Sequence, residues 1–370
     1  MSKAAELANL IGNINAGGGG VNRNVIINGD FKVKQRAGTG TQATDLGASS
    51  GYHLHDRWNL DFASTAGRLT VSHDSSAPSG FANSMKLACT TADTSISSAE
   101  IFNIQQRIEG QNLQAFAKGT SDAKPFAVSF YVKGNASATY VAELYDSDNT
   151  RQISKTFNVT TDWTRVELSF PADTTGAFDD DNASSLFLLI WLHAGSTYSS
   201  GTLNSSSWAS VTNANRAAGI SSFFDSTART FFLTGVQLEI GQNPTSFEHE
   251  PFETTEKKCQ RYYEKHSYTE QYHHIQFGIA NSTTQMQTKL YYRKQKRAAP
   301  TVAFSANGTF RLNNYVGGDE VCNSVSAGQI NTTELRIQWA KSTGNFTTGN
   351  AAYVNTENHN DATIELDAEL

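Results

Sequence analysis

The sequence is poor in charged residues and in cysteine, and each shortage excludes a class of protein. Charged residues make up 17% of the 370 residues, and 29 Lys and Arg face 35 Asp and Glu, so the net charge is −6. A chain without a basic excess lacks the electrostatic means to hold nucleic acid, so we expect neither DNA nor RNA as a partner. The three cysteines, Cys89, Cys259 and Cys322, are too widely spaced to suggest a disulfide framework or a paired-cysteine metal site.

Long hydrophobic runs are missing as well. The longest apolar stretch, residues 186–192, is far shorter than the ~20 residues that cross a bilayer, so no membrane insertion is expected. The first residues do not have the order of a secretion signal, which predicts a protein made in the cytoplasm without a signal peptide. Aromatic residues, in contrast, reach 11%. A weakly charged, aromatic-rich chain of this length predicts two or three folded units rather than disorder.

The first segment, residues 1–20, is predicted to be a short helix followed by a glycine hinge. Residues 2–11 are good helix formers, and Gly12 together with the glycines at 17–20 is expected to end the helix. The apolar side chains of this helix recur at helical spacing: Ala4, Leu7, Leu10 and Ile11. Because a helix of about ten residues is marginal alone in water, this stripe is expected to bind a partner, and a frayed terminus is the alternative.

Residues 21–251 are predicted to form an antiparallel β-sandwich. Apolar and polar residues alternate, most clearly in 126–132 and 236–240, and loops rich in Ser, Thr, Asn, Asp and Gly separate the apolar runs. About eight such runs without a helical period between them favour a jelly roll. Residues 186–192 have no polar face, so we place this strand centrally, with both faces covered.

Residues 252–370 are predicted to form a short helix and a second small β domain. The helix is expected over residues 254–265, and strand-like runs follow it to the end of the chain. Charge is uneven in this part of the sequence. Residues 256–297 hold nine basic and three acidic side chains, whereas residues 319–370 hold two basic and eight acidic ones.

Motifs that would indicate catalysis or a metal are weak. Residues 47–51 match the nucleophile-elbow pattern, but neither a hydrophobic strand nor a helix flanks them, so we expect no enzyme. The acidic run Asp179, Asp180 and Asp181 offers hard oxygen ligands that would suit calcium, as do Asp146 and Asp148. These residues also sit between strand-like runs, where Asp occurs for turn geometry alone, and no other cofactor is indicated.

Aromatic side chains are the better indication of a binding site. Flat rings stack on sugar faces while neighbouring amides and carboxylates bond the hydroxyls, and Trp208 lies in a Ser- and Asn-rich loop where a ring has no evident core role. Trp208 is therefore the first candidate for a carbohydrate platform. Four tyrosines join it: Tyr198, Tyr272, Tyr291 and Tyr292. The last two adjoin the basic residues of 293–297, and this surface would meet an anionic polysaccharide or a protein; the alternative is ordinary strands whose charges keep their edges soluble.

Several short motifs carry a resemblance to a known family. Residues 24–36 (NVIINGDFKVKQR) and 52–58 (YHLHDRW) resemble the opening of carbohydrate-binding-module-like jelly rolls in bacteriophage tail fibre and other virion fibre proteins. The similarity continues at residues 161–165, 232–241, 245–252, 297–302 and 366–370. Together these motifs cover most of the chain beyond the glycine hinge.

The resemblance implies a homotrimeric fibre on the exterior of a virion, made in the host cytoplasm. Such a fibre attaches to other tail or head proteins through its N-terminus and meets host cell-surface polysaccharide with its distal part. Related modules often hold a structural calcium through an Asp just before the last strand, where this sequence has Leu233–Val236. Two alternatives stay open: a fibre that degrades polysaccharide, and a receptor-free decoration protein of the capsid or tail.

Overall fold

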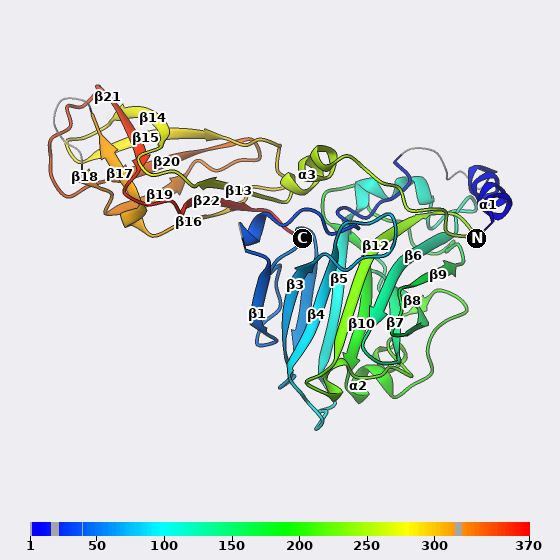
Figure 1. The fold of residues 1–370 in the computed structure, drawn as a ribbon. Helices are drawn as coiled ribbons and strands as arrows, with labels where there is room; N and C mark the ends of the chain where they lie inside the picture. The colour runs from blue at the N-terminus through cyan, green and yellow to red at the C-terminus, as the bar shows by residue number, and fades with distance from the viewer. Residues whose placement is uncertain (1, 16–21, 39, 315–319) are drawn as a thin grey trace. The chain divides into compact units, whose positions relative to one another are not determined.

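The computed structural model describes residues 2–15, 22–38, 40–314 and 320–370, and the chain divides into two units. The first unit comprises Met1–Thr255 with Leu370, and the second comprises Glu256–Glu369. Both consist of antiparallel strands and the N-terminal helix is short, so the mostly β fold class predicted from the sequence is confirmed (Figure 1). No helix in the described ranges combines the length and the apolarity that a bilayer span requires.

The first unit is a β-sandwich of jelly-roll type with two six-stranded sheets. One sheet has the order β1 (Gln42–Leu46), β3 (Arg68–Asp74), β4 (Ser84–Thr91), β12 (Thr230–Ile240), β6 (Phe126–Gly134), β9 (Thr164–Phe170). The other has the order β11 (Ala209–Ser210), β8 (Arg151–Val159), β7 (Ala138–Asp146), β10 (Ser184–Ala194), β5 (Ile101–Glu109), β2 (Asn59–Ala63). Successive strands switch repeatedly between the sheets, and one hydrophobic core fills the space between them.

Strand β10 lies between β7 and β5, near the middle of its sheet. The even-numbered residues from Leu186 to Leu192 point into the main core, whereas Leu189 and Trp191 pack in a second cluster on the other face of the sheet. The prediction of a central strand with both faces covered is thus confirmed, except that Phe187 is only half-buried.

The connection between β10 and β12 closes this second face. It contains α2 (Ser196–Ser199) and brings Ala217 into the second cluster, with Tyr198 packed against it. Elsewhere the loops hold short 3-10 turns: η1 (Gln35–Ala37), η2 (Gly110–Asn112), η3 (Gln114–Phe116), η4 (Asn213–Asn215), η5 (Phe223–Asp225) and, in the second unit, η6 (Asn307–Thr309).

Helix α1 (Lys3–Asn15) carries the predicted anchor residues. It continues through Gly12, so the expectation that this glycine ends the helix is wrong; one glycine inside a helix costs only about 1 kcal/mol. The glycines at 17–20 lie outside the described residues. Leu7 and Ile11 are 57% and 50% exposed, and Leu10 is half-buried.

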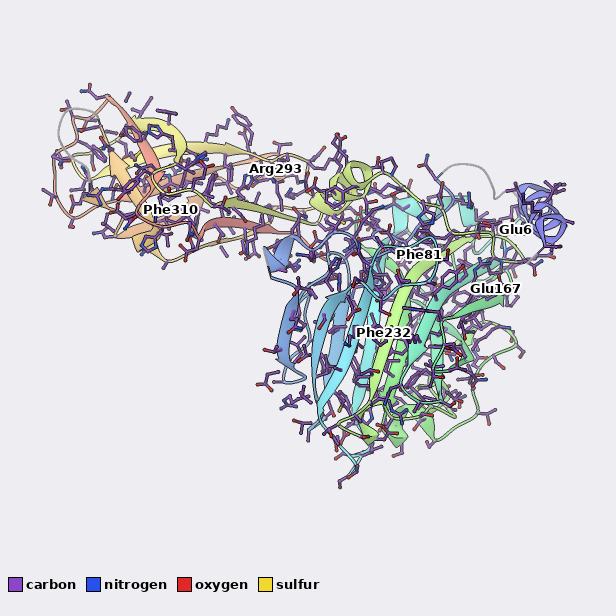
Figure 2. All side chains as sticks on the ribbon, viewed as in Figure 1. Glu6, Phe81, Glu167, Phe232, Arg293 and Phe310 are labelled. Carbon is purple, nitrogen blue, oxygen red and sulfur yellow. The ribbon has the colours of Figure 1, made fainter. Side chains whose placement is uncertain are left out.

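The second unit packs a three-stranded sheet on a seven-stranded one. The small sheet has the order β13 (Tyr263–Tyr268), β22 (Ala362–Asp367), β16 (Thr301–Phe304). The large sheet has the order β18 (Glu320–Val321), β17 (Phe310–Asn313), β21 (Ala351–Thr356), β14 (His274–Ala280), β15 (Gln285–Tyr291), β20 (Glu334–Ala340), β19 (Ser324–Gly328). Phe310 lies among these strands in Figure 2 and is fully buried in the unit's own core.

The helix α3 (Phe252–Gln260) is shorter than the predicted one, which was to continue to residue 265. Residues from Tyr263 onward form β13 instead, since they pair with β22 at the end of the chain. Tyr262 and Tyr263 are each 1% exposed. The burial of these two rings stabilises them more than one further helical turn would.

Candidate functional site

The candidate site is the outer face of the seven-stranded sheet in the second unit. Side chains of a strand alternate between its two faces, and in β15 Met286 and Leu290 point into the core. The outward residues of three adjacent strands therefore share one face: Phe277 and Ile279 of β14, Gln287, Lys289 and Tyr291 of β15, and Glu334, Arg336 and Gln338 of β20.

This face is hollowed between β14, β15 and β20. The hollow has a volume of about 530 Å³. Its apolar lining comes from Phe277 and Ile279, and the main polar lining comes from Asn281, Gln287, Lys289, Gln329, Glu334 and Arg336. It thus combines an apolar wall with groups that donate and accept hydrogen bonds.

The hollow forms where β14 and β15 separate. β14 pairs with β21 from His274 to Ile279, but its ladder with β15 has only two pairs. At Gly278 the backbones come so close that a Cβ would lie 1.9 Å from the carbonyl oxygen of Gln287. Beyond this point the Gln276 side chain bridges the strands, accepting a hydrogen bond from Thr288 Oγ1 at 2.6 Å.

Aromatic rings form the wall of the hollow on the β14 side. Phe277 is 65% exposed and its ring centroid lies 5.6 Å from that of His274 and 5.8 Å from that of Tyr353. His274 in turn stacks on Tyr353 at 4.5 Å with an interplanar angle of 10°. The phenyl ring is thus supported by other rings while most of its surface is open to a ligand.

A network of carboxamides forms the polar part of the hollow. Gln287 Nε2 and Asn281 Nδ2 both donate to Gln338 Oε1, at 2.9 and 3.1 Å. Gln338 Nε2 donates back to Asn281 Oδ1 at 3.3 Å. Because each carboxamide has two donor hydrogens and two lone pairs, these bonds fix the amides and leave capacity for a bound molecule.

Two cations and one carboxylate lie in the hollow. Lys289 Nζ contacts Glu334 Oε1 at 2.7 Å, and this hydrogen bond raises the pKa of Lys289. The Lys289 ammonium also lies 4.9 Å from the ring centroid of Tyr291. Arg336 makes no such pair with a carboxylate within the described part of the chain.

The tyrosines predicted for this part of the chain fall in different places. Tyr291 is 65% exposed and adjoins the hollow, whereas Tyr272, 56% exposed, lies in the connection between β13 and β14. Tyr292 is half-buried, and burial raises the pKa of its hydroxyl to about 12.

The predicted basic surface needs a correction. Lys296 is not on a surface: its ammonium is fully buried and contacts Glu264 Oε2 at 2.5 Å. Arg293, labelled in Figure 2, and Lys294 are exposed, as expected.

Trp208 is not a binding platform, and that prediction is wrong. Its side chain is 7% exposed, its indole Nε1 donates to Pro171 O at 2.9 Å, and its ring lies 5.4 Å from that of Phe126. The Ser residues before it face solvent while the ring closes the core. Tyr198 is half-buried, and its ring packs 5.6 Å from that of Trp191, so little of it is available to a ligand.

Of the predicted calcium ligands, Asp181 and Asp146 already bond other groups of the protein. Asp179, Asp180 and Asp181 are exposed, and Asp181 Oδ1 accepts from Ala183 N at 2.8 Å, as in an ordinary Asx turn. Asp146 is committed to the buried ammonium of Lys118 at 2.5 Å. A calcium ion at residues 179–181 stays a prediction.

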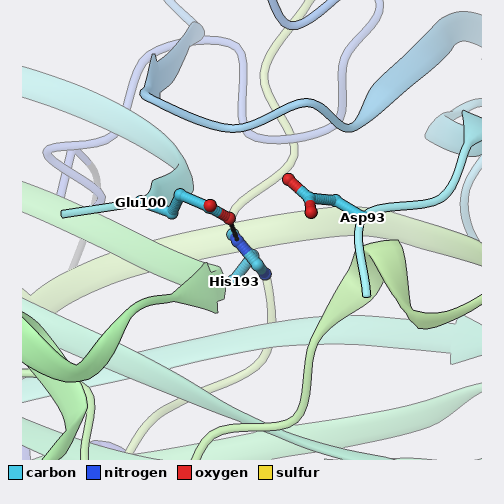
Figure 3. Close-up of side chains that lie close together, drawn as sticks. All are labelled: Asp93, Glu100 and His193. Carbon is cyan, nitrogen blue, oxygen red and sulfur yellow. Dashed lines mark hydrogen bonds and ion pairs between the residues drawn. The ribbon is translucent and has the colours of Figure 1, made fainter. Parts of the chain in front are cut away.

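Another group of ionisable side chains is buried in the first unit (Figure 3). Asp93, Glu100 and His193 place their ligand atoms within 4.8 Å of one another. Protein donors already occupy them: Asp93 Oδ2 accepts from Ala66 N at 2.7 Å, Glu100 Oε1 from Ser97 N at 2.6 Å. His193 Nε2 contacts Glu100 Oε2 at 3.0 Å. We therefore regard the group as a structural network.

The first unit has a hollow of similar size, about 540 Å³, lined by Glu6, Phe81, Glu167 and neighbouring residues (Figure 2). Its rings pack on one another, with Phe81 lying 5.3 Å from Tyr131 and 5.1 Å from Phe247. Its cation, Arg165, contacts Glu167 at 2.5 Å. The rings of this hollow thus pack on one another, and the charge of Arg165 is already paired with a carboxylate.

The solved structures that resemble this chain include carbohydrate-binding modules, each at low similarity. No family model and no curated protein matches it. A CBM4 module has a TM-score of 0.29 at 12% identity and is covered over 97% of its length by 58% of this chain. The enzymatically active domain of tailspike protein 4 from bacteriophage CBA120 has a TM-score of 0.32 at 12% identity, over 59% of this chain and 21% of that one. The CBM22-1-GH10 modules of xylanase 10B from Clostridium thermocellum, complexed with xylohexaose, have a TM-score of 0.30 at 14% identity, over 59% of this chain and 29% of that one.

Proposed function

We propose that this protein binds a saccharide in the hollow between β14, β15 and β20. The observation that carries the proposal is a 65% exposed phenyl ring, Phe277, beside a fixed network of carboxamides. A sugar presents a C–H face that stacks on a ring and hydroxyls that exchange hydrogen bonds with amides. A partner with only apolar surface would leave the amides unsatisfied, and a purely ionic partner would make no use of the ring.

The test is a binding titration of a panel of polysaccharides against the protein and two variants. In Phe277→Ala the dissociation constant is expected to rise about tenfold, because a ring contact contributes about 1 to 1.5 kcal/mol. Tyr272→Ala is the matched control, since Tyr272 is similarly exposed and does not line the hollow. Equal affinities for Phe277→Ala and the unchanged protein would exclude this site.

The proposed activity is binding without cleavage. Glycoside hydrolysis ordinarily needs two carboxyl groups on either side of the scissile bond. Among the described residues that line the hollow, Glu334 is the one carboxylate, and Lys289 holds it. Oligosaccharides released from any bound polymer during incubation would contradict this part of the proposal and favour a depolymerase.

We also propose that the protein is a homotrimeric fibre subunit on a virion exterior, attached to tail or head proteins through α1 and directed at host polysaccharide. In support, α1 exposes Leu7 and Ile11 at helical spacing, and such a stripe is stabilised by burial against a partner. Deletion of residues 2–11 is expected to abolish incorporation into particles while both β units stay folded. Particles that retain the shortened chain would refute the anchor, and a monomeric mass by light scattering would refute the trimer.

A further inference from the structure

Arg336 differs from other arginines of the second unit in having no hydrogen-bond or ion-pair partner among the described residues. Arg311 is paired with Glu357, and the Arg297 guanidinium donates to the carbonyl of Ala368. Arg336 forms no hydrogen bond or ion pair with any described residue, and its Nε is shielded from solvent without an acceptor. Its terminal nitrogens, Nη1 and Nη2, are not shielded in this way and keep their donor hydrogens for a ligand.

The strand register places Arg336 directly opposite a second cation. Arg336 of β20 pairs with Lys289 of β15 on the same face of the sheet. Like charges at such a pair repel each other. Glu334 compensates only Lys289, at 2.7 Å, so the hollow has one uncompensated positive charge.

A glycine makes room for the guanidinium on the other side of Arg336. Its partner on β19 is Gly328, where a Cβ would lie 3.0 Å from Nη2 of Arg336. The guanidinium therefore lies close against bare backbone instead of a side chain. Neither cross-strand partner of Arg336 compensates its charge, and Arg336 itself lines the hollow.

We propose, resting on the saccharide-binding role above, that the ligand is an acidic saccharide whose carboxylate is received by Arg336. A guanidinium presents a planar fork that matches a carboxylate with two parallel hydrogen bonds. One uncompensated positive charge corresponds to one carboxylate. Other sugar rings of the same polymer lie on Phe277 and meet Asn281 and Gln287 with their hydroxyls.

The experiment uses pairs of polymers that differ only in the carboxylate. Polygalacturonate, alginate and hyaluronan are each compared with the same polymer after carboxyl reduction, by titration against the full chain in buffers of low and high salt. The unchanged protein is expected to bind at least one acidic polymer at least tenfold more tightly than its reduced form. Arg336→Gln is expected to remove this difference and to leave the affinity for the reduced polymer unchanged.

Two further variants distinguish the contribution of the planar guanidinium from the contribution of its positive charge. Arg336→Lys keeps the charge and loses the fork, so its affinity is expected to fall between those of the unchanged protein and Arg336→Gln. Lys294→Gln removes an exposed positive charge that does not line the hollow, and it is expected to change affinity less than twofold.

The outcomes distinguish failure of this inference from failure of the proposed function. Binding of acidic and reduced polymers with equal affinity would overturn the carboxylate while saccharide binding stands. Absence of binding to every polymer in the panel would overturn both. If Arg336→Gln weakens binding of the reduced polymers equally, or changes the oligomeric mass measured without polymer, Arg336 serves the fold or a second copy of the chain, and the inference is wrong.

Discussion

Arg216 in the first unit and Arg336 in the second both lie over the outer face of a sheet, yet their surroundings differ. Arg216 donates to Glu143 at 2.8 and 3.0 Å, and its guanidinium lies 5.1 Å from the rings of Tyr145 and Trp191. The connection after β10 covers that face and supplies this arginine. On the outer face of β14, β15 and β20, Phe277 and Tyr291 remain 65% exposed. The same residue types thus stabilise the fold where the chain covers them and remain available for a ligand where it does not.

The largest expected effect concerns Trp208, which closes the core of the first unit. Trp208→Ala removes a buried ring and should lower the free energy of unfolding by about 3 to 5 kcal/mol. Tyr291→Ala, on the bare face, should change it by no more than about 0.5 kcal/mol. Urea denaturation of both variants measures the contrast. A Trp208→Ala protein of unchanged stability with weakened saccharide binding would restore Trp208 as a platform.

The next effect compares the two arginines themselves. Arg216→Met leaves the Glu143 carboxylate buried without its cation and should cost about 3 kcal/mol of stability. Arg336→Met breaks no pair, so its effect should be within about 0.5 kcal/mol. Equal losses in denaturation midpoint would mean that the chain uses the two arginines in the same way.

A third prediction concerns acid stability of the second unit. Burial alone raises the pKa of Glu264, but the hydrogen bond with His266 and the charge of Lys296 outweigh it and lower the pKa from 4.5 to about 2. Because the folded pKa lies below the unfolded one, this stabilisation is complete above pH 4.5 and is lost as the pH falls toward 2. Stability measured from pH 5 to 2 should fall steeply for the unchanged protein.

Two comparisons test that assignment. The fall should be clearly smaller in Glu264→Gln and retained in Glu334→Gln, whose site is at the surface. If Glu264→Gln fails to fold, the carboxyl chemical shift of Glu264 in the unchanged protein serves instead, and a midpoint near pH 4.5 would contradict the prediction.

The smallest expected effect is a nearly unchanged saccharide affinity. Tyr272→Ala should leave saccharide affinity within about twofold, while Phe277→Ala loses about tenfold, because Phe277 alone of the two lines the hollow. A larger loss at Tyr272 would move the binding surface toward the connection between β13 and β14.

The local sequence pattern predicted the fold correctly where the residues of a strand are apolar on both faces. Residues 186–192 have no polar face, which predicted the central position of β10. The prediction of Trp208 as a binding platform failed because its ring closes the sandwich core from a loop. The residues around it in that loop are polar and gave no sign of this core position. The end of α3 was missed because residues from 263 onward pair with β22, which is distant in the sequence.

Only some residues of the candidate site could be predicted from the sequence. Strand-like runs were predicted at residues 287–292 and 334–339, and Tyr291 lies on the exposed face of the first one. Phe277 and Arg336 were missed because nothing local distinguishes a ring that points to solvent from one in the core, or a free guanidinium from a paired one. The sequence distance between Asp93 and His193 likewise concealed the buried network that they share with Glu100.

Low charge, abundant aromatics and period-two alternation were enough to determine a mostly β protein with a short N-terminal helix, because these properties follow from each residue and its near neighbours. Only the tertiary structure decided the exposure of particular groups. It determined which sheet face is left uncovered, which arginine has no partner among the described residues and which ring is exposed to solvent. Each depends on a strand or connection that arrives from elsewhere in the chain, and burial and counter-charge belong to the pair of segments that meet.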